Sequence, residues 1–396
     1  MSFLVAILLF ISLAIILIPV LVLLLQAVVA FSPLRAGSPA TGRRPTIAIL
    51  VPAHNESSGV IATISSLLPQ LQNGDRLIVV ADNCSDDTAE IALRAGAEVH
   101  VRADLSQRGK GYALDFGVRV LAASPPEVVI IIDADCIAST GTVDRIARLS
   151  LQTGRPIQAL SLMRALENSG PMKKIAEFAW LVKNLVRPLG YHRLGLPCQL
   201  MGTGMAFSWA TISTASLANG NIVEDLKLGM DLARAGNPPL FCPDALVSST
   251  FPMSESGTQT QRTRWEHGHI SMMLTEAPPL LFGGLRQRNA GMIALGLDLC
   301  VPPLALLTLM VLALFVVTGL FAVITANLAP VLFACVVMGG LVTAVMLSWW
   351  RYGRERLSAA NLAMAVFYVF WKIPLYLKFF VSRQVEWVRS KRDGEL

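Results

Sequence analysis

Two long stretches of the chain carry no charged side chain, residues 1–34 and residues 299–350. A helix needs about 20 consecutive apolar residues to cross a membrane. The first stretch therefore predicts one transmembrane anchor and the second predicts two spans, with a break at residues 327–330. The first stretch is also far longer than the apolar core of a signal peptide, so we expect the anchor to be retained.

A shorter apolar stretch follows at residues 357–371, and Lys372, Pro374 and Lys378 interrupt its continuation. This pattern is compatible with a third C-terminal span or with a helix that lies in the membrane interface. A basic tail over residues 383–396 favours a cytoplasmic chain end, and hence the interfacial helix. We expect the C-terminal membrane region as a whole to cover residues 291–382.

Between the apolar stretches, residues 35–290 alternate short, β-branched apolar runs with helical periodicity. Short runs of this kind are typical of buried strands. Strands that alternate with helices predict an α/β domain with a mostly parallel sheet and right-handed crossovers. The predicted strands are 46–52, 76–81, 98–101 and 127–132, and the predicted helices include 59–71, 111–123 and 226–235.

The composition supports a membrane protein, because 54% of the 396 residues are hydrophobic and only 15% are charged, against about a quarter charged in soluble domains. The net charge is +6. Lys and Arg gather beside the apolar stretches rather than in a stripe, which argues against nucleic acid as a partner. Basic flanks mark the cytoplasmic side of membrane helices. We therefore expect a multi-pass protein of the cell membrane (the inner membrane in a Gram-negative cell) with a cytoplasmic central domain.

Acidic segments follow three of the predicted strands, at residues 53–58, 82–88 and 133–135. Ligands of open α/β sheets bind at the carboxyl ends of the strands, so this placement predicts a site there. The first strand is not followed by a G-x-G-x-x-G fingerprint, and the glycines around Lys110 do not form a Walker loop. Dehydrogenase and P-loop NTPase functions are therefore disfavoured.

Asp133 and Asp135 form an Asp-x-Asp at the end of the strongest predicted strand. Alternate residues of a strand point the same way, so both carboxylates would reach one Mg²⁺ or Mn²⁺ ion, which prefers oxygen ligands. A solvated loop is the alternative. In the segment before them, Asp86 and Asp87 fit a helix start, with Ser85 or Asp86 as its N-cap, whereas Asp82 at the strand end is placed to bind a nucleobase or ribose.

Glu224 and Asp225 precede a predicted helix that closes at Gly236. They fit either simple partners of the helix dipole or a general base that accepts a hydroxyl proton, and Asp225 is the candidate base. The segment Gly202-Thr203-Gly204 allows a close backbone approach to a ligand or makes a plain turn.

Further along, Arg262 or Arg264 would hold a diphosphate, and Trp265 would stack on a sugar. An interfacial belt of Arg and Trp is the alternative interpretation. We expect His267 and His269 to be surface residues rather than metal ligands. The six cysteines contain no C-x-x-C pair, so we expect reduced thiols.

These motifs, in this order between membrane helices, resemble the family 2 glycosyltransferases of GT-A fold, which include cellulose, chitin and hyaluronan synthases and ceramide glucosyltransferases. The resemblance covers about residues 47–269. It implies a Rossmann-like GT-A domain in the cytoplasm, flanked by transmembrane helices. The implied donor site comprises Pro52, Ala53, Glu56, Asp82, Lys110, Asp133 and Arg264; the implied acceptor site comprises Gly202, Thr203, Gly204, Gln261 and Trp265; Asp135 and Asp133 would bind the metal, and Asp225 with Glu224 would be catalytic.

Two departures from the family pattern stand out. Val223 occupies a position where many synthases have Thr, and residues 201–205 differ from the Cys-Gly-Ser type of the synthases. The C-terminal membrane region is also short for a polymer channel, which favours addition of a single sugar unless homo-oligomers form.

The expected function is inverting, metal-dependent transfer of a sugar from a nucleotide-sugar, with UDP-sugar preferred. The acceptor would be a polyprenyl-linked oligosaccharide, a lipid or an exopolysaccharide at the bilayer. Two alternatives remain open: a nucleotidyltransferase of similar architecture, which would not need Gln-x-x-Arg-Trp, and a non-catalytic membrane assembly partner.

Overall fold

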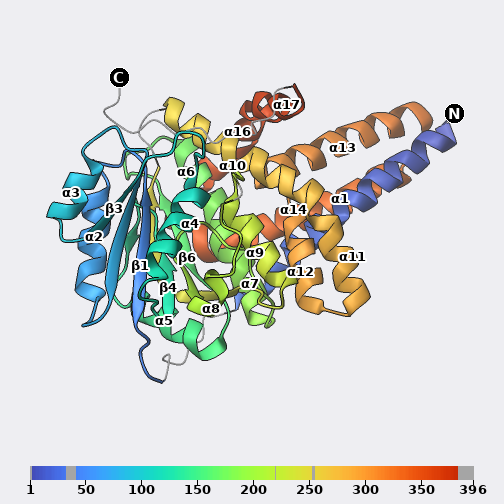
Figure 1. Cartoon of the computed structure of the whole chain (residues 1–396). Helices are drawn as coiled ribbons and strands as arrows, with labels where there is room; N and C mark the ends of the chain where they lie inside the picture. The colour runs from blue at the N-terminus through green and yellow to red at the C-terminus, as the bar shows by residue number, and fades with distance from the viewer. Residues whose placement is uncertain (1, 33–41, 219, 252–254, 382–396) are drawn as a thin grey trace. The chain divides into compact units, whose positions relative to one another are not determined.

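The computed structural model describes residues 2–32, 42–218, 220–251 and 255–381, with the side chains of 255–260 and 380–381 left out. The chain forms two compact units. Among the described residues, one unit contains 42–164 and 196–268 and holds the sheet. The other contains 2–32, 165–195 and 269–381 and is helical. Figure 1 labels the elements.

An eight-stranded mixed sheet forms the centre of the first unit, in the order β3-β2-β1-β4-β7-β6-β8-β5. The pairs β3/β2, β2/β1, β1/β4 and β6/β8 are parallel, whereas β7 and β5 pair antiparallel with their neighbours. The sheet is therefore mostly parallel, as expected. The strands are β1 (Ile47–Ala53), β2 (Arg76–Asp82), β3 (Glu98–Arg102), β4 (Val128–Ile131), β5 (Ile137–Ala138), β6 (Ile157–Arg164), β7 (Met205–Ser208) and β8 (Leu240–Thr250).

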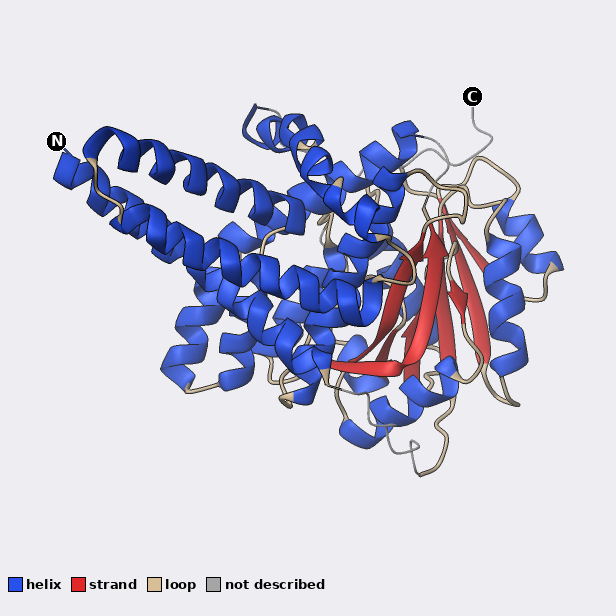
Figure 2. Ribbon diagram, turned by 180° about the vertical axis from the view of Figure 1, so that it is seen from behind, coloured by secondary structure: helices blue, strands red, loops and turns tan. Residues whose placement is uncertain are grey.

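Helices cover both faces of this sheet (Figure 2) because successive strand residues point to opposite sides. Ile47, Ile49 and Val51 of β1 pack in the core that includes α2 and α5, whereas Ala48 and Leu50 pack in the core that includes α4 and α9. The helices of this unit are α2 (Val60–Leu67) with the 3₁₀ turn η1 (Leu68–Gln70), α3 (Thr88–Arg94), α4 (Lys110–Leu121), α5 (Thr142–Thr153), α8 (Trp209–Ile212), α9 (Glu224–Arg234) and the first part of α10 (Glu255–Thr275).

In the part of the helical unit that the structure describes, four helical stretches are long and apolar enough to cross a membrane: residues 2–31, 304–325, 329–353 and 359–379. The break between the second and third stretches lies at residues 326–328 and overlaps the predicted break at 327–330. The last stretch consists of three short helices, so length and composition leave both the transmembrane and the interfacial alternative open. The helices of this unit are α1 (Ser2–Phe31), α6 (Pro171–Leu181), the π-helix η2 (Val182–Val186), α7 (Arg187–Arg193), α11 (Ala277–Gln287), α12 (Ala290–Leu299), α13 (Leu304–Thr325), α14 (Ala329–Ser348), the π-helix η3 (Trp349–Gly353), α15 (Ala359–Ala363), α16 (Ala365–Trp371) and α17 (Ile373–Val381).

The division into units differs from the expected boundaries at 34/35 and 290/291, because residues 165–195 and 269–290 belong with the apolar helices. A buried polar cluster accounts for part of this. Arg187 of α7 pairs with Asp298 of α12 at 2.9 Å, and Gln26 of α1 donates to the same carboxylate at 2.7 Å. A Cβ on Gly190 would lie 2.4 Å from the Gln26 carbonyl oxygen, so α7 packs directly on α1. Sequence periodicity does not reveal such long-range pairing.

Candidate active site

The carboxyl ends of β1, β2 and β4 lie at one edge of the sheet, and the acidic segments follow them there, as expected. Asp82 is the last residue of β2, and Ala53 is the last residue of β1. Asp133 comes two residues after the end of β4. Three loops that are far apart in sequence therefore converge, and the candidate site is built where they meet.

A tight turn after β4 brings Asp133 and Asp135 together. The strand ends at Ile131, and the backbone N–H of Cys136 donates to the Asp133 carbonyl at 3.1 Å. One ligand atom from each of Asp133, Asp135 and Cys136 lies within 4.8 Å of the other two. The two carboxylates thus converge through a turn, not through the strand alternation that we expected.

The metal-ligand atoms that this turn offers fit a hard divalent cation bound by the two aspartates. Carboxylate oxygens are the ligands that Mg²⁺ and Mn²⁺ prefer. Burial raises the pKa of the Cys136 thiol well above its ordinary value, and the charges of Asp135 and Asp133 raise it further. Because a thiol must lose its proton to bind a metal, Cys136 is a poor ligand here, and the oxygen pair remains.

Lys110, the first residue of α4, places its ammonium group among the carboxylates. Its Nζ lies 2.5 Å from Asp133 Oδ1 and 3.9 Å from Glu224 Oε1, and it donates to the Gly202 carbonyl oxygen at 2.7 Å. Burial opposes the charge, but the carboxylates of Asp133 and Glu224 outweigh burial and hold the pKa of Lys110 above its ordinary value. The predicted donor-binding lysine is therefore at the site.

Helix α9 begins at Glu224, two residues earlier than the sequence predicts, so Glu224 and Asp225 form its first turn. The helix dipole favours negative charge at this end. Burial raises the pKa of Glu224 to about 7; Lys110 opposes this shift and Asp225 adds to it. At the other end of α9, Gly236 has a φ of +88°, which agrees with the predicted C′ position.

The segment Gly202-Thr203-Gly204 runs beside these carboxylates. Both glycines have positive φ, +87° and +68°. The Thr203 hydroxyl accepts from the backbone N–H of Asp133 at 3.1 Å. Gly204 donates to the Ile131 carbonyl at 2.9 Å, and a Cβ there would lie 2.9 Å from the Ala159 Cβ. The segment is a turn with two left-handed glycines, as one of the two interpretations predicts, and its backbone packs beside the site; a close approach to a ligand stays a prediction.

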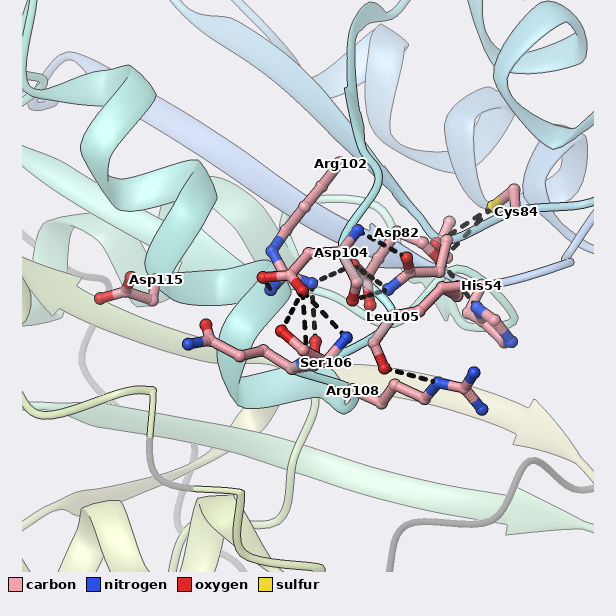
Figure 3. Close-up of polar contacts among 12 residues, drawn as sticks. His54, Asp82, Cys84, Arg102, Asp104, Leu105, Ser106, Arg108 and Asp115 are labelled. Carbon is pink, nitrogen blue, oxygen red and sulfur yellow. Dashed lines mark hydrogen bonds and ion pairs between the residues drawn. The ribbon is translucent and has the colours of Figure 1, made fainter.

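Asp82 is buried and forms an ion pair with Arg102, the last residue of β3 (Figure 3). Arg102 Nη1 lies 2.6 Å from Asp82 Oδ1 and also donates to the Gln107 carbonyl at 2.9 Å. The side chain of Asn83 donates to the same Asp82 oxygen at 3.1 Å. Sequence reasoning missed Arg102, which directly follows the predicted strand 98–101 and whose pairing with Asp82 depends on the register of β2 against β3.

The loop after β1, which holds the expected donor residues Pro52, Ala53 and Glu56, is bonded to the loop after β2. His54 Nδ1 lies 2.6 Å from the Asp82 carbonyl, and the Glu56 backbone N–H donates to the Thr88 hydroxyl at 2.8 Å. The two loops therefore form one surface.

Asp86 and Asp87 were expected in the first turn of a helix. They lie just before α3, because this helix starts at Thr88. Asp86 accepts from the Thr88 backbone N–H at 3.1 Å and from the Ser57 N–H at 3.2 Å. Asp87 occupies the N-cap position, but its side chain makes no capping bond. Asp86 thus accepts a hydrogen bond from the helix start, as expected of a capping residue, although it lies one residue before the N-cap position.

Helix α10 carries Gln261, Arg262, Arg264 and Trp265. Gln261 and Arg262 are buried, and the Arg262 guanidinium lies 5.8 Å from the centre of the Phe251 ring. Arg264 acts on Glu224, where its positive charge opposes the rise of the carboxyl pKa. Of the two arginines, Arg264 therefore acts electrostatically on Glu224, whereas Arg262 contacts the Phe251 ring.

The expectation that His267 and His269 are surface residues is wrong, because both are buried. His269 Nε2 lies 3.0 Å from the Val301 carbonyl, and burial lowers its pKa to about 3, with Lys183 and Arg187 adding to the effect. The sequence of α10 intersperses charged and apolar residues and has no apolar face, so its pattern did not predict that the two histidines are buried.

Comparison with known proteins identifies the family and the fold of the chain. The model of the family described as "Glycosyltransferase like family 2" matches residues 45–268. An uncharacterized glycosyltransferase of Mycobacterium tuberculosis is 29% identical over 188 residues, which cover 42% of this chain and 82% of the relative. The probable glycosyltransferase YdaM of Bacillus subtilis is 25% identical over 254 residues, 58% of this chain and 56% of YdaM.

An uncharacterized protein of Methanocaldococcus jannaschii is 30% identical over 135 residues, 33% of this chain and 54% of that protein. The chain thus spans about half the length of this relative and of YdaM. Among solved structures, a mannosyltransferase of Pyrobaculum calidifontis in complex with GDP-Man and Mn²⁺ has a TM-score of 0.54 at 15% identity, covering 89% of this chain and 100% of that one. This likeness confirms the GT-A fold.

Proposed function

The chain belongs to glycosyltransferase-like family 2, and from that premise we propose that it transfers a sugar from a nucleotide-diphosphate donor to a hydroxyl group of a membrane-associated acceptor. The observation that carries the proposal is the convergence of Asp133, Glu224 and Asp225 around Lys110 at the carboxyl edge of the sheet. Neither a membrane anchor nor a structural α/β domain needs four ionisable side chains packed together in this way.

Asp133 and Asp135 would hold Mn²⁺ or Mg²⁺. The P. calidifontis mannosyltransferase was solved with Mn²⁺ and GDP-Man, and the two carboxylates fit the same kind of ion. When bound, the cation supplies charge neutralisation for the diphosphate leaving group. Lys110 and Arg264 would add positive charge on the protein side, since both lie within electrostatic range of Glu224.

Asp225 is the proposed base. In the inverting reaction the acceptor oxygen forms a bond to the anomeric carbon while the bond from that carbon to the diphosphate breaks, and the acceptor proton passes to a carboxylate. The nucleoside diphosphate leaves with the electron pair of the broken bond. Gly202 packs closely against Asp225, since even a single Cβ at this position would come within 3.3 Å of the Asp225 Oδ2.

The surface formed by the loops after β1 and β2 would receive the nucleoside, with Pro52, Ala53, Glu56 and Asp82 as the contacts. A uridine donor is preferred, and a guanosine donor is the alternative suggested by the P. calidifontis enzyme. Gly202, Thr203, Gly204, Gln261 and Trp265 would contact the acceptor.

The acceptor would be a polyprenyl-linked oligosaccharide, a lipid or an exopolysaccharide, because the described part of the chain has four apolar stretches long enough to cross a membrane. In this proposal the protein lies in the cell membrane with its catalytic unit in the cytoplasm. A single added sugar is expected, and a homo-oligomer would be needed to enclose a polymer.

The test is an assay of membranes that contain the full chain, across UDP-, GDP- and dTDP-sugars with Mg²⁺ or Mn²⁺. Sugar transfer releases the nucleoside diphosphate, and one donor should give release that depends on the metal. Release of pyrophosphate would instead favour a nucleotidyltransferase. The absence of both products, together with no thermal shift on addition of any donor, would favour a non-catalytic assembly partner.

A further inference from the structure

The ammonium group of Lys110 lies among the carboxylates of Asp133, Glu224 and Asp225 and pairs with Asp133, a proposed metal ligand. Its Nζ is 2.5 Å from Asp133 Oδ1, and its second partner, the Gly202 carbonyl oxygen, lies 2.7 Å away. A Cβ built on Gly202 would come within 3.6 Å of the same Nζ and 3.3 Å of Asp225 Oδ2. One lysine therefore borders both the proposed metal ligand and the proposed base.

We propose that Lys110 competes with the divalent cation for Asp133, and that it moves from Asp133 to the donor diphosphate once the cation is bound. The inference rests on the proposed function and adds an order of events to it. Two cations a few ångströms apart in a partly buried site repel each other strongly. The ammonium must therefore weaken cation binding for as long as it stays on Asp133.

The local structure allows the side chain to move. Lys110 carries a compact charge on a flexible four-carbon stem, and its side chain keeps 17% of its surface exposed. The ammonium donates to the Gly202 carbonyl and pairs with the Asp133 carboxylate. A phosphate oxygen of the donor could take the place of either acceptor. A lysine that only supported the fold would not need to lie between the two groups that perform the chemistry.

The consequence is a pair of opposite effects at one position. Removing the positive charge should strengthen the binding of the cation alone, because its competitor is gone. The same change should weaken the binding of a nucleoside diphosphate in the presence of the cation, because a charge-assisted contact is lost. A purely structural role would weaken both, so the signs separate the two explanations.

The experiment measures Mn²⁺ binding to the full-length protein in detergent at pH 8, by the EPR signal of free Mn²⁺. For Lys110→Met we expect the dissociation constant of Mn²⁺ to fall about tenfold, from the repulsion removed. With saturating Mn²⁺ we expect the dissociation constant of UDP or GDP, whichever the wild type binds, to rise about tenfold, as for a lost hydrogen bond between charged groups. Lys110→Gln is the second neutral variant, in case the first does not fold.

Lys227→Met is the matched control. Lys227 lies on α9 and pairs with Asp231 of the same helix, so its loss should leave Mn²⁺ affinity unchanged. Unchanged or weaker Mn²⁺ binding by the folded Lys110 variants overturns the inference and leaves the proposed function standing. A wild-type protein that binds no Mn²⁺ overturns the metal dependence of the proposed function, and the inference with it.

Discussion

Arg102 and Asp82 form a buried ion pair, 2.6 Å from Nη1 to Oδ1, between the ends of two adjacent parallel strands. Both side chains are less than 10% exposed. Arg102 also reaches the carbonyl of Gln107 and the carboxylate of Asp104. The guanidinium therefore connects the proposed nucleoside-binding residue to the loop that leads into Lys110 and α4.

Replacing Arg102 by Met should destabilise the protein by about 3–5 kcal/mol, because the Asp82 carboxylate would stay buried without its partner. Thermal unfolding in detergent measures the change. Arg76→Met is the control, since the Arg76–Glu98 pair joins the same two strands at their other ends but is more exposed, and such pairs contribute only about 0–1 kcal/mol. Equal losses in the two variants would contradict a special role for the buried pair.

Gly268 of α10 lies against Val223, the residue before Glu224. A Cβ on Gly268 would come within 2.4 Å of Val223 Cγ1, so Gly268→Ala should displace α10 from the start of α9. We expect a loss of about 1–3 kcal/mol from overpacking and a lower kcat, because Arg264 and Asp225 shift relative to each other.

The second change Val223→Ala should restore both stability and kcat, since it removes the colliding methyl groups. Gly319→Ala is the control: Gly319 also lies inside a helix but faces open space. The account of this contact fails if Gly268→Ala has wild-type kcat, or if Val223→Ala deepens the defect.

Glu224 should make stability fall as pH rises. Its pKa is raised from 4.5 to about 7 in the folded protein, chiefly by burial, so the unfolded chain ionises first. The stability that the protonated carboxyl contributes is complete below pH 4.5 and is lost as the pH rises towards 7. The Tm of Glu224→Gln relative to wild type should therefore increase between pH 5 and pH 8. A difference that is constant or decreases over this range would show that burial does not set the pKa.

The sequence alone predicted the elements that form the site, and the limits of that prediction have physical causes. The strands around Asp82 and Asp133 end within one residue of their expected positions, because apolar β-branched runs and the polar residues after them are local signals. The pairing of Arg102 with Asp82 depends on the register of β2 against β3, which no local pattern encodes. The place of Lys110 between Asp133 and Glu224 depends on how α4 and α9 pack.

One expectation failed because no local pattern encodes the burial. His267 and His269 were expected at the surface, but both are buried, although the sequence of α10 lacks an apolar face. The grouping of residues 165–195 with the apolar helices also depends on contacts between distant segments, through Arg187, Gly190 and their partners.

The central claim is that Asp225 takes the proton of the acceptor hydroxyl during sugar transfer. The most direct measurement is nucleoside diphosphate release by Asp225→Asn, with donor binding followed in parallel and Asp231→Asn, two turns later on α9, as the control. We predict that Asp225→Asn folds and binds the donor but loses about 10²–10⁴-fold in kcat, the usual contribution of a general base, while Asp231→Asn keeps its activity. An Asp225→Asn protein that transfers sugar at the wild-type rate would contradict the account.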